Sequence, residues 1–484
     1  MTGIRNTTTG VYWQIIGGLS QTVIRIGASM FLARALSPED FGLFAMAILF
    51  FGIFELMSLS GITNALIVKK NPDELDLSTC FWSIVAFRIC ILIVGYLLAP
   101  SIALYMESPL LESLIKNLSL LILISGFGAL QQSMLAKALN FKVIVSIKLL
   151  AIILESTLAV FLVAKLNMDY NALVLSMIAG VTITNLLFFI TSSWRPRLTF
   201  SLKRLKYLLR FGLNNMGTSL AMYSVNNIDY LVVGKLLGDK SLGFYEFAYR
   251  IPHIINERLT GPTSAVVFST LSLNNSSNET LLKTFESSLR WYALIATPIF
   301  TGLAIVSENL ILFLWGEQWL TAIPLMQILC LGGLINSITE TNRYLFLCCN
   351  KPHIPFRFEL IVLALSLIFI PFGTYTFGLK GAAVAMALVQ ATRTINTWYG
   401  IKLLKGSITQ LINPLLAPIV CSACMFISVY FLKESEALKP DSNILQLLQM
   451  LMLGAVTCIA SMFCMFKKDL NNVYEYLISN RGIK

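Results

Sequence analysis

Fourteen stretches near twenty residues in length, each dominated by apolar side chains, restrict the fold of this 484-residue chain more than any other feature. An α-helix of about 20 apolar residues crosses the roughly 30 Å hydrocarbon core of a bilayer. Only 13% of the residues are charged, whereas soluble proteins carry about 25%. We therefore predict an all-α polytopic membrane protein of about 14 transmembrane helices. The predicted spans are 11–35, 41–66, 80–105, 110–135, 146–166, 170–193, 207–233, 242–271, 287–313, 320–347, 356–378, 381–403, 411–432 and 444–466.

The basic residues predict the orientation of these spans. If the N-terminus is cytoplasmic, the inner loops and termini, counted with the helix ends next to them, hold 23 of the 36 Lys and Arg residues, and the outer loops counted in the same way hold eight. This asymmetry follows the positive-inside rule and puts both termini in the cytoplasm. The net charge of +11 is then a topology signal, and no nucleic-acid partner is expected; a cytosolic partner for the basic 193–210 loop is the alternative interpretation. The five remaining basic residues fall inside predicted helices: Arg25, Arg88, Arg250, Arg258 and Arg393.

Several kinds of chemistry find no support in the sequence. Cys421 and Cys424 form a CxxC pair, but they lie in an apolar span without a second pair, so we expect no zinc site. His253 and His353 are the only histidines, which argues against a histidine metal cluster. No loop exceeds about twenty residues, too few for a separate catalytic domain. We therefore expect a transporter without cofactor or metal, and not an enzyme.

An internal repeat organises the chain. Residues 36–47 read LSPEDFGLFAMA, and residues 237–248 read LGDKSLGFYEFA, at an offset of 201. Both copies form the short outer turn between the first two helices of a half, so the repeat is parallel. It predicts two pseudo-symmetric six-helix lobes around a central cavity, followed by two extra helices. The predicted boundaries are 1–205 for the N-lobe, 206–405 for the C-lobe and 406–484 for the additional helices and cytoplasmic tail.

Polar residues recur at helical spacing in equivalent helices of the two halves. In the first span Gln14, Gln21 and Arg25 share one helix face, and the offset of 201 matches this face to Asn215 and Asn226 in the 207–233 span. Such faces either line a cavity or allow close packing of helices through small residues and interhelical amides. Because polar groups at membrane depth are usually functional, we favour cavity lining.

The 242–271 span carries a denser polar face, with Glu246, Arg250, His253 and Glu257 at steps of four, three and four. Its repeat counterparts in the 41–66 span are uncharged, so the two halves have diverged at this face. A charged face in one half only indicates a specialised site.

The deep arginines favour an anionic ligand. Arg25 lies near the middle of its span, too deep to reach the interface easily, whereas Arg88 is close enough to a helix end to snorkel. A guanidinium binds phosphate oxygens through two hydrogen bonds. The alternative is internal ion pairing, for which Glu55, Glu155 and Glu359 are available. Five carboxylates are candidates for coupling or for ion pairing: Asp229, Glu155, Glu246, Glu257 and Glu359.

Three segments resemble a known family. LARALSPEDFGLFAMA at 32–47, GKLLGDKSLGFYEFA at 234–248 and WGEQW at 315–319 are similar to the polysaccharide-exporter branch of the multidrug/oligosaccharidyl-lipid/polysaccharide exporter superfamily, especially to Wzx-type flippases of the colanic-acid exporter kind. This resemblance implies a bacterial inner-membrane protein that moves undecaprenyl-pyrophosphate-linked oligosaccharide to the periplasmic leaflet for O-antigen or exopolysaccharide synthesis. It implies membrane lipids and the lipid-linked oligosaccharide as partners, with a polysaccharide polymerase and a chain-length regulator as further candidates.

The prediction is therefore a flippase that works by alternating access. Arg25, Arg88 and Arg250 are predicted to hold the pyrophosphate, while the amides of the two polar faces contact sugar hydroxyls. A cation-coupled multidrug antiporter of the same superfamily is the first alternative; it would require an acidic cavity. A membrane polysaccharide polymerase or ligase is the second, and it would require a large outer loop.

Overall fold

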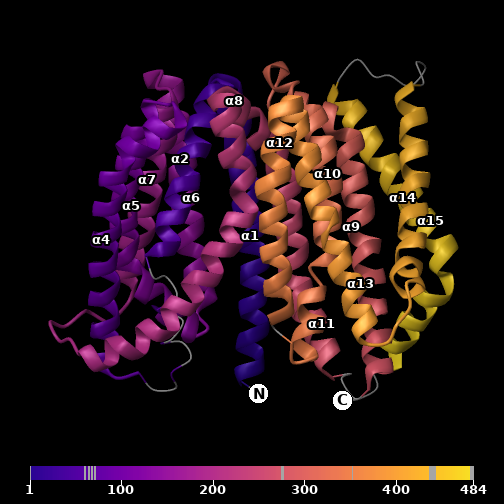
Figure 1. Cartoon of the computed structure of the whole chain (residues 1–484), viewed down its shortest axis with the longest axis horizontal. Coiled ribbons are helices and arrows are strands. Elements are labelled where there is room, and N and C mark those ends of the chain that lie inside the picture. The colour runs from indigo at the N-terminus through magenta and orange to yellow at the C-terminus, as the bar shows by residue number, and fades with distance from the viewer. Residues whose placement is uncertain are drawn as a thin grey trace. The chain divides into compact units, whose positions relative to one another are not determined.

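The computed structural model describes the chain except for residues 1, 59–61, 64–65, 67–68, 70–71, 274–276, 352, 435–442 and 480–484, together with some further side chains, mainly of residues 2–11, 207–218, 261–266 and 466–479. Within the described residues the secondary structure is helical throughout (Figure 1). The helices are α1 (Thr2–Ala35), α2 (Pro38–Met57), α4 (Glu74–Met106), α5 (Leu110–Lys137), α6 (Phe141–Leu166), α7 (Tyr170–Thr191), α8 (Leu202–Leu273), α9 (Asn278–Leu314), η1 (Glu317–Trp319), α10 (Ala322–Thr339), α11 (Asn342–Cys348), α12 (His353–Ala391), α13 (Arg393–Leu403), α14 (Thr409–Glu434) and α15 (Asn443–Ser479).

The predicted all-α membrane fold is confirmed by these helices. Of the described part of the chain, 11 helical segments are long and apolar enough to cross a membrane. Helix α8, which is interrupted at Gly238, covers the predicted spans 207–233 and 242–271, and α12, which is interrupted at Gly378, covers 356–378 and the start of 381–403. Gly238 and Gly378 adopt φ of +80° and +61°, a conformation that glycine reaches without a steric penalty, and each breaks the helix there. Each of α8 and α12 therefore consists of two helical segments, which agrees with the two spans predicted for each.

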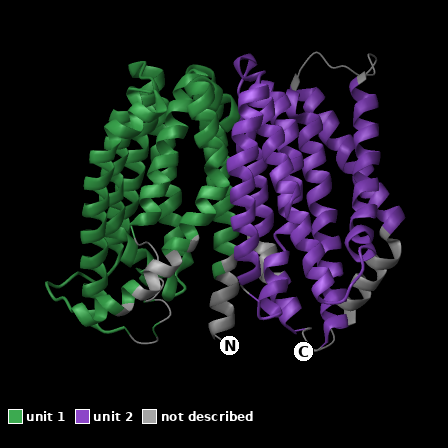
Figure 2. Cartoon of the chain, in the orientation of Figure 1, with its two compact units in different colours: residues 1–246 green, residues 247–484 purple. Residues whose placement is uncertain are grey.

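The chain divides into two compact units, residues 1–246 and 247–484 (Figure 2). The division falls inside α8, two residues before the end of the second repeat copy. The lobe boundaries at 205 and 405 stay a prediction from the repeat.

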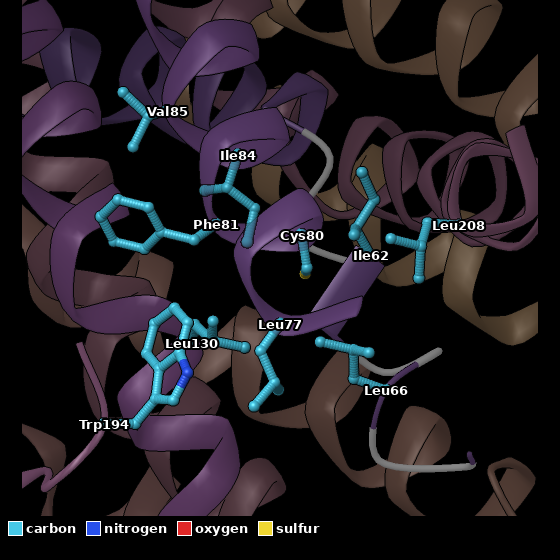
Figure 3. Close-up of a cluster of buried hydrophobic side chains, with 10 residues drawn as sticks. All are labelled: Ile62, Leu66, Leu77, Cys80, Phe81, Ile84, Val85, Leu130, Trp194 and Leu208. Carbon is cyan, nitrogen blue, oxygen red and sulfur yellow. The ribbon is translucent and has the colours of Figure 1, made fainter. Parts of the chain in front are cut away.

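The core of unit 1 includes a cluster of buried apolar side chains between α4, α5 and the segment that leads from α7 into α8 (Figure 3). Phe81 contacts Trp194 edge to face, with 6.0 Å between the ring centroids. The ten members are Ile62, Leu66, Leu77, Cys80, Phe81, Ile84, Val85, Leu130, Trp194 and Leu208. Apolar clusters of unit 2 join α9 to α14 and α15, and the end of α8 to α9, α11 and α13.

Acidic residues at the start of α4 hold the basic segment between α7 and α8. Arg204 pairs with Asp73 at 2.8 Å and with Asp76 at 2.5 Å. Glu74 accepts a hydrogen bond from the indole of Trp194 at 3.0 Å. Part of the positive charge that marks this segment in the sequence is therefore neutralised within unit 1.

At the opposite end of unit 1, the two repeat copies contact each other. A Cβ placed on Gly42 would lie 1.7 Å from the carbonyl oxygen of Asp239, and one on Gly243 would lie 1.9 Å from that of Pro38. Gly42 and Gly243 differ by 201 residues, as do Pro38 and Asp239, so the contact is reciprocal between equivalent residues. A side chain of any size at either glycine would separate the two turns.

Two carboxylates beside this contact have opposite environments. Burial raises the pKa of Asp239, although the Ser108 hydroxyl donates a hydrogen bond to its Oδ2 at 2.9 Å. The ammonium of Lys235, which donates to Glu107 Oε1 at 2.7 Å, lowers the pKa of Glu107. These polar contacts join the turn between α4 and α5 to the bend of α8.

Candidate functional site

Arg88 of α4 and Glu55 of α2 form an ion pair inside unit 1. The guanidinium is 3% exposed, and its two terminal nitrogens lie 2.7 Å and 3.2 Å from the two carboxylate oxygens. Arg88 also donates to the carbonyl oxygen of Ile122 at 2.6 Å and to the hydroxyl of Ser125. The structure thus gives Arg88 the internal partner that the sequence left as the alternative to snorkelling.

A polar pocket of about 380 Å³ opens beside this ion pair, between α2, α4, α5 and α7. Most of its lining residues carry hydrogen-bonding side chains, and α5 and α7 contribute hydroxyls and amides to it. Ile84 lines the pocket and also belongs to the apolar cluster of Figure 3, so that cluster borders the pocket. The polar lining residues are Glu55, Thr63, Arg88, Ser125, Gln132, Ser133, Thr184 and Asn185.

Unit 2 contains a second ion pair of the same kind. Arg393 donates to both oxygens of Glu359 at 2.6 Å and 2.9 Å, and its side chain is 13% exposed. Glu340 lies within electrostatic reach of both residues. Glu359 is therefore bound to an arginine, as the ion-pairing interpretation of the sequence expected.

Two carboxylates at the bend of α8 bind tyrosines. Asp229 is fully buried; its Oδ2 accepts from the Tyr245 hydroxyl at 2.9 Å, and its Oδ1 accepts from the backbone amide of Tyr230 at 3.0 Å. Glu246 accepts from the Tyr230 hydroxyl at 2.5 Å. The two tyrosine rings meet edge to face with centroids 5.8 Å apart. Asp229 is thus a buried carboxylate whose described hydrogen-bond partners are all uncharged.

The first polar face is accessible on α1. Gln14 and Arg25 are exposed and Gln21 is half-buried. Glu155 of α6 lies within electrostatic reach of Arg25. Asn226 of α8 is exposed, whereas the side chain of Asn215 lies outside the described residues.

The second half of α8 carries the charged face that the sequence predicts. The Arg250 guanidinium lies 4.4 Å from the centre of the Phe247 ring, a cation–π geometry. His253 Nε2 lies 3.6 Å from Glu257 Oε1, and both of these side chains are exposed. By residue number, Arg250 and Glu257 belong to unit 2, whereas Arg25 and Arg88 belong to unit 1.

Unit 2 also has an open apolar cavity of about 600 Å³, bounded mainly by α9, α14 and α15. Trp291, Pro298 and Met425 are among its lining residues, and none of the lining side chains is charged or carries an amide or hydroxyl. The two helices that follow the repeats thus form one wall of an apolar space.

The polar pocket of unit 1 was not predicted. The sequence suggested Glu55 only as a partner for a deep arginine, and it gave no role to the polar residues of α5 and α7. A signal was present, because Ser125 and Gln132 are seven residues apart on one face of an otherwise apolar span.

Comparisons with known proteins agree on the class of this chain. The sequence profile of the family described as "Polysaccharide biosynthesis protein" matches residues 31–324, more than half of the chain, and the chain belongs to this family. It is 28% identical over 399 residues to the lipopolysaccharide biosynthesis protein WzxC of Escherichia coli K12, covering 81% of this chain and 80% of that protein.

Two further relatives cover most of the chain. The teichuronic acid biosynthesis protein TuaB of Bacillus subtilis is 24% identical over 428 residues, 87% of this chain and 88% of that protein. The succinoglycan biosynthesis transport protein ExoT of Rhizobium meliloti is 23% identical over 456 residues, 93% of this chain and 92% of that protein.

Solved structures share the fold. The lipid II flippase MurJ in an inward closed conformation superposes with a TM-score of 0.76 at 17% identity, covering 95% of this chain and all of that chain. An inward-facing multidrug resistance transporter of the MATE family and MOP superfamily gives a TM-score of 0.65 at 15% identity, covering 81% of this chain and 98% of that one. The predicted family and fold class are confirmed.

Proposed function

We propose that this protein is a flippase that moves a polyprenyl-pyrophosphate-linked oligosaccharide across the membrane by alternating access. The observation that carries the proposal is the match to the polysaccharide biosynthesis family on a chain with 11 membrane-length helical segments among its described residues. A glycan is made from cytoplasmic precursors and must cross a hydrocarbon layer in which unsatisfied polar groups are strongly unfavourable. A helical membrane protein of this family is suited to replace the hydration of the sugar during that crossing.

In this proposal Arg25 of unit 1 binds the pyrophosphate, and Arg250 of unit 2 stays a ligand predicted from the sequence alone. Arg25 is exposed on α1, so its donors are accessible to a ligand. Arg88, the third predicted phosphate ligand, already shares its donors with a carboxylate, so we give it a secondary role at most. The amides of Gln14, Gln21, Asn215 and Asn226 contact the sugar hydroxyls that follow the pyrophosphate.

Membrane potential can drive this transport. Moving one charge across a potential of 100 mV changes its free energy by about 2.3 kcal/mol. The transfer of a pyrophosphate with about two negative charges out of a negative cytoplasm is therefore favoured by about 4–5 kcal/mol at this potential. A carboxylate that carries a proton or cation would reduce this gain and couple transport to that ion. Asp229 is the best placed, because it is fully buried with uncharged partners, whereas Glu359 is bound to Arg393. Glu155, Glu246 and Glu257 are the remaining coupling candidates.

The isoprenoid tail occupies the apolar cavity of unit 2. Its 600 Å³ volume and uncharged lining fit a hydrocarbon chain and would be unfavourable for a glycan. This assignment gives a role to α14 and α15, which lie beyond the repeated helices.

The orientation predicted from the basic residues completes the proposal. Both termini lie in the cytoplasm, and the protein resides in a bacterial inner membrane, where it supplies an O-antigen or exopolysaccharide pathway. A polysaccharide polymerase that uses the translocated repeat unit and a chain-length regulator are the proposed protein partners.

The proposal is tested in cells that lack this protein. Lipid-linked repeat units are expected to accumulate in the cytoplasmic leaflet, and the wild-type gene restores polymer, whereas Arg25→Ala does not. Arg343→Ala is the matched control, because Arg343 is an exposed arginine outside the proposed pyrophosphate site. Normal polymer with Arg25→Ala at normal protein level would remove Arg25 from the site, and unchanged repeat-unit levels in the deletion strain would reject the flippase.

A further inference from the structure

The polar pocket of unit 1 has the size of a ligand site. Its 380 Å³ falls within the roughly 300–1,000 Å³ of small-molecule pockets. A polar cavity at membrane depth is unfavourable unless water or a ligand satisfies its groups. Its purpose therefore needs an explanation beyond the packing of the helix bundle.

The internal repeat allows this pocket to be compared with the corresponding position in unit 2. Asn256 is the counterpart of Glu55 at the offset of 201, and it lines a cavity of only about 10 Å³ in unit 2. Asn256 Oδ1 accepts from the Ser337 hydroxyl at 2.6 Å, much as Glu55 Oε2 accepts from Ser125 at 3.4 Å. Among the described residues of unit 2, this hydrogen bond is kept beside a cavity of only about 10 Å³, so the hydrogen bond itself does not require a pocket as large as that of unit 1.

The charges in the pocket select against ions. Arg88 and Glu55 neutralise each other through two short contacts, and their remaining neighbours in the pocket are uncharged. A phosphate would be repelled by the Glu55 carboxylate, and a metal cation by the Arg88 guanidinium. A neutral ligand suits the pocket best.

The hydrogen-bonding groups favour a ligand with several hydroxyls. Thr184 and Ser133 donate their own hydroxyl hydrogens to backbone carbonyls of Gly180 and Ala129, at 2.7 Å and 3.0 Å, which leaves their oxygens able to accept. Gln132 lines the pocket, and among the described residues its amide has no hydrogen-bond partner. Sugar hydroxyls, which both donate and accept, match this mixture.

We propose that this pocket is a subsite for an uncharged sugar ring of the transported glycan, separate from the pyrophosphate position at Arg25. The inference rests on the proposed flippase function and adds the chemistry of one binding position. The hydroxyls of the ring donate to Thr184 and Ser133 and accept from Gln132. Its less polar face packs on Ile84, which lines the pocket beside them.

The test compares two lipids that differ only in the glycan. The full-length protein is placed in lipid nanodiscs, and binding is measured for the isolated lipid-linked repeat unit and for undecaprenyl pyrophosphate. A single hydrogen bond contributes about 0.5–1.5 kcal/mol, so losing two of them weakens binding by about 5- to 150-fold. Gln132→Leu combined with Thr184→Val is expected to weaken repeat-unit binding within this range and to leave undecaprenyl pyrophosphate binding unchanged.

Ser337→Ala is the matched control, because it removes the hydroxyl that donates to Asn256 in unit 2 and is expected to change neither affinity. Thr184→Val alone, which replaces one hydroxyl by a methyl group, is used if the double variant fails to fold. An unchanged repeat-unit affinity, or an equal loss for both lipids, would overturn the sugar subsite while leaving the flippase proposal intact. If the wild-type protein binds neither lipid, the flippase proposal itself fails, and the subsite with it.

Discussion

Replacing Gly42 by alanine should open the contact between the two repeat copies. The added Cβ would lie 1.7 Å from the carbonyl oxygen of Asp239 and 2.8 Å from the amide nitrogen of Gly243. Ordinary carbon–oxygen contacts begin near 3.3 Å, so the two turns must separate by about 1.6 Å. Both neighbouring atoms belong to the backbone, and no side-chain rotation can relieve the overlap.

The magnitude follows from this rigidity. Overpacking a close contact destabilises it by about 1–3 kcal/mol, which shifts an equilibrium between closed and open contacts by about 5- to 150-fold. In the proposed orientation these turns lie at the extracytoplasmic end, so Gly42→Ala should favour states that are open on that side. Gly243→Ala should act in the same way, because its Cβ would meet the Pro38 carbonyl oxygen at 1.9 Å.

Hydrogen exchange of the protein in nanodiscs measures this effect. Amides in residues 36–45 and 237–246 should exchange faster in either alanine variant than in the wild type. Gly217→Ala is the matched control, because no atom lies within 4 Å of its Cβ position. Exchange at the wild-type rate at both turns in both variants would refute the close contact and the predicted shift toward states that are open on the extracytoplasmic side.

Two further predictions concern buried charge. Glu55→Gln leaves Arg88 without its counter-charge and should lower the free energy of unfolding by about 3 kcal/mol. The double variant Glu55→Gln with Arg88→Met should recover most of this loss. A double-mutant cycle that shows no coupling between the two positions would contradict the ion pair. The raised pKa of Asp239 predicts that its contribution to stability is greatest below about pH 4 and declines as the pH rises through the raised value. Asp239→Asn should remove this decline in pH-dependent unfolding, and an unchanged profile would count against the burial of the carboxyl.

The fold was largely predictable because the bilayer restricts it. Apolar runs of fixed length and the distribution of arginine and lysine are visible in the sequence, and both reflect requirements of the membrane. The 201-residue offset is visible in the same way and indicates the repeat. Gly238 and Gly378 were not recognised as the breaks that separate adjacent spans. A lone glycine between apolar segments is compatible with a loop as well as with a bent continuous helix.

The site was predicted less completely, because pairing between helices is a tertiary property. Hydropathy placed Arg88 inside a predicted span, but nothing in the spacing joins it to Glu55, 33 residues earlier on another helix. The same holds for Arg393 and Glu359. The polar pocket was missed because its hydroxyls and amides come from different helices, and no single helix face contains enough of them to stand out.

The central claim is tested most directly by flipping with the purified protein. Proteoliposomes contain the isolated lipid-linked repeat unit in both leaflets, and a membrane-impermeant oxidant of vicinal diols modifies the outer glycans. With wild-type protein, nearly all repeat units should become oxidised, while Arg25→Ala and protein-free vesicles stop at about the outer half. An inner half that stays protected in the presence of folded wild-type protein would contradict the assignment of this protein as a flippase.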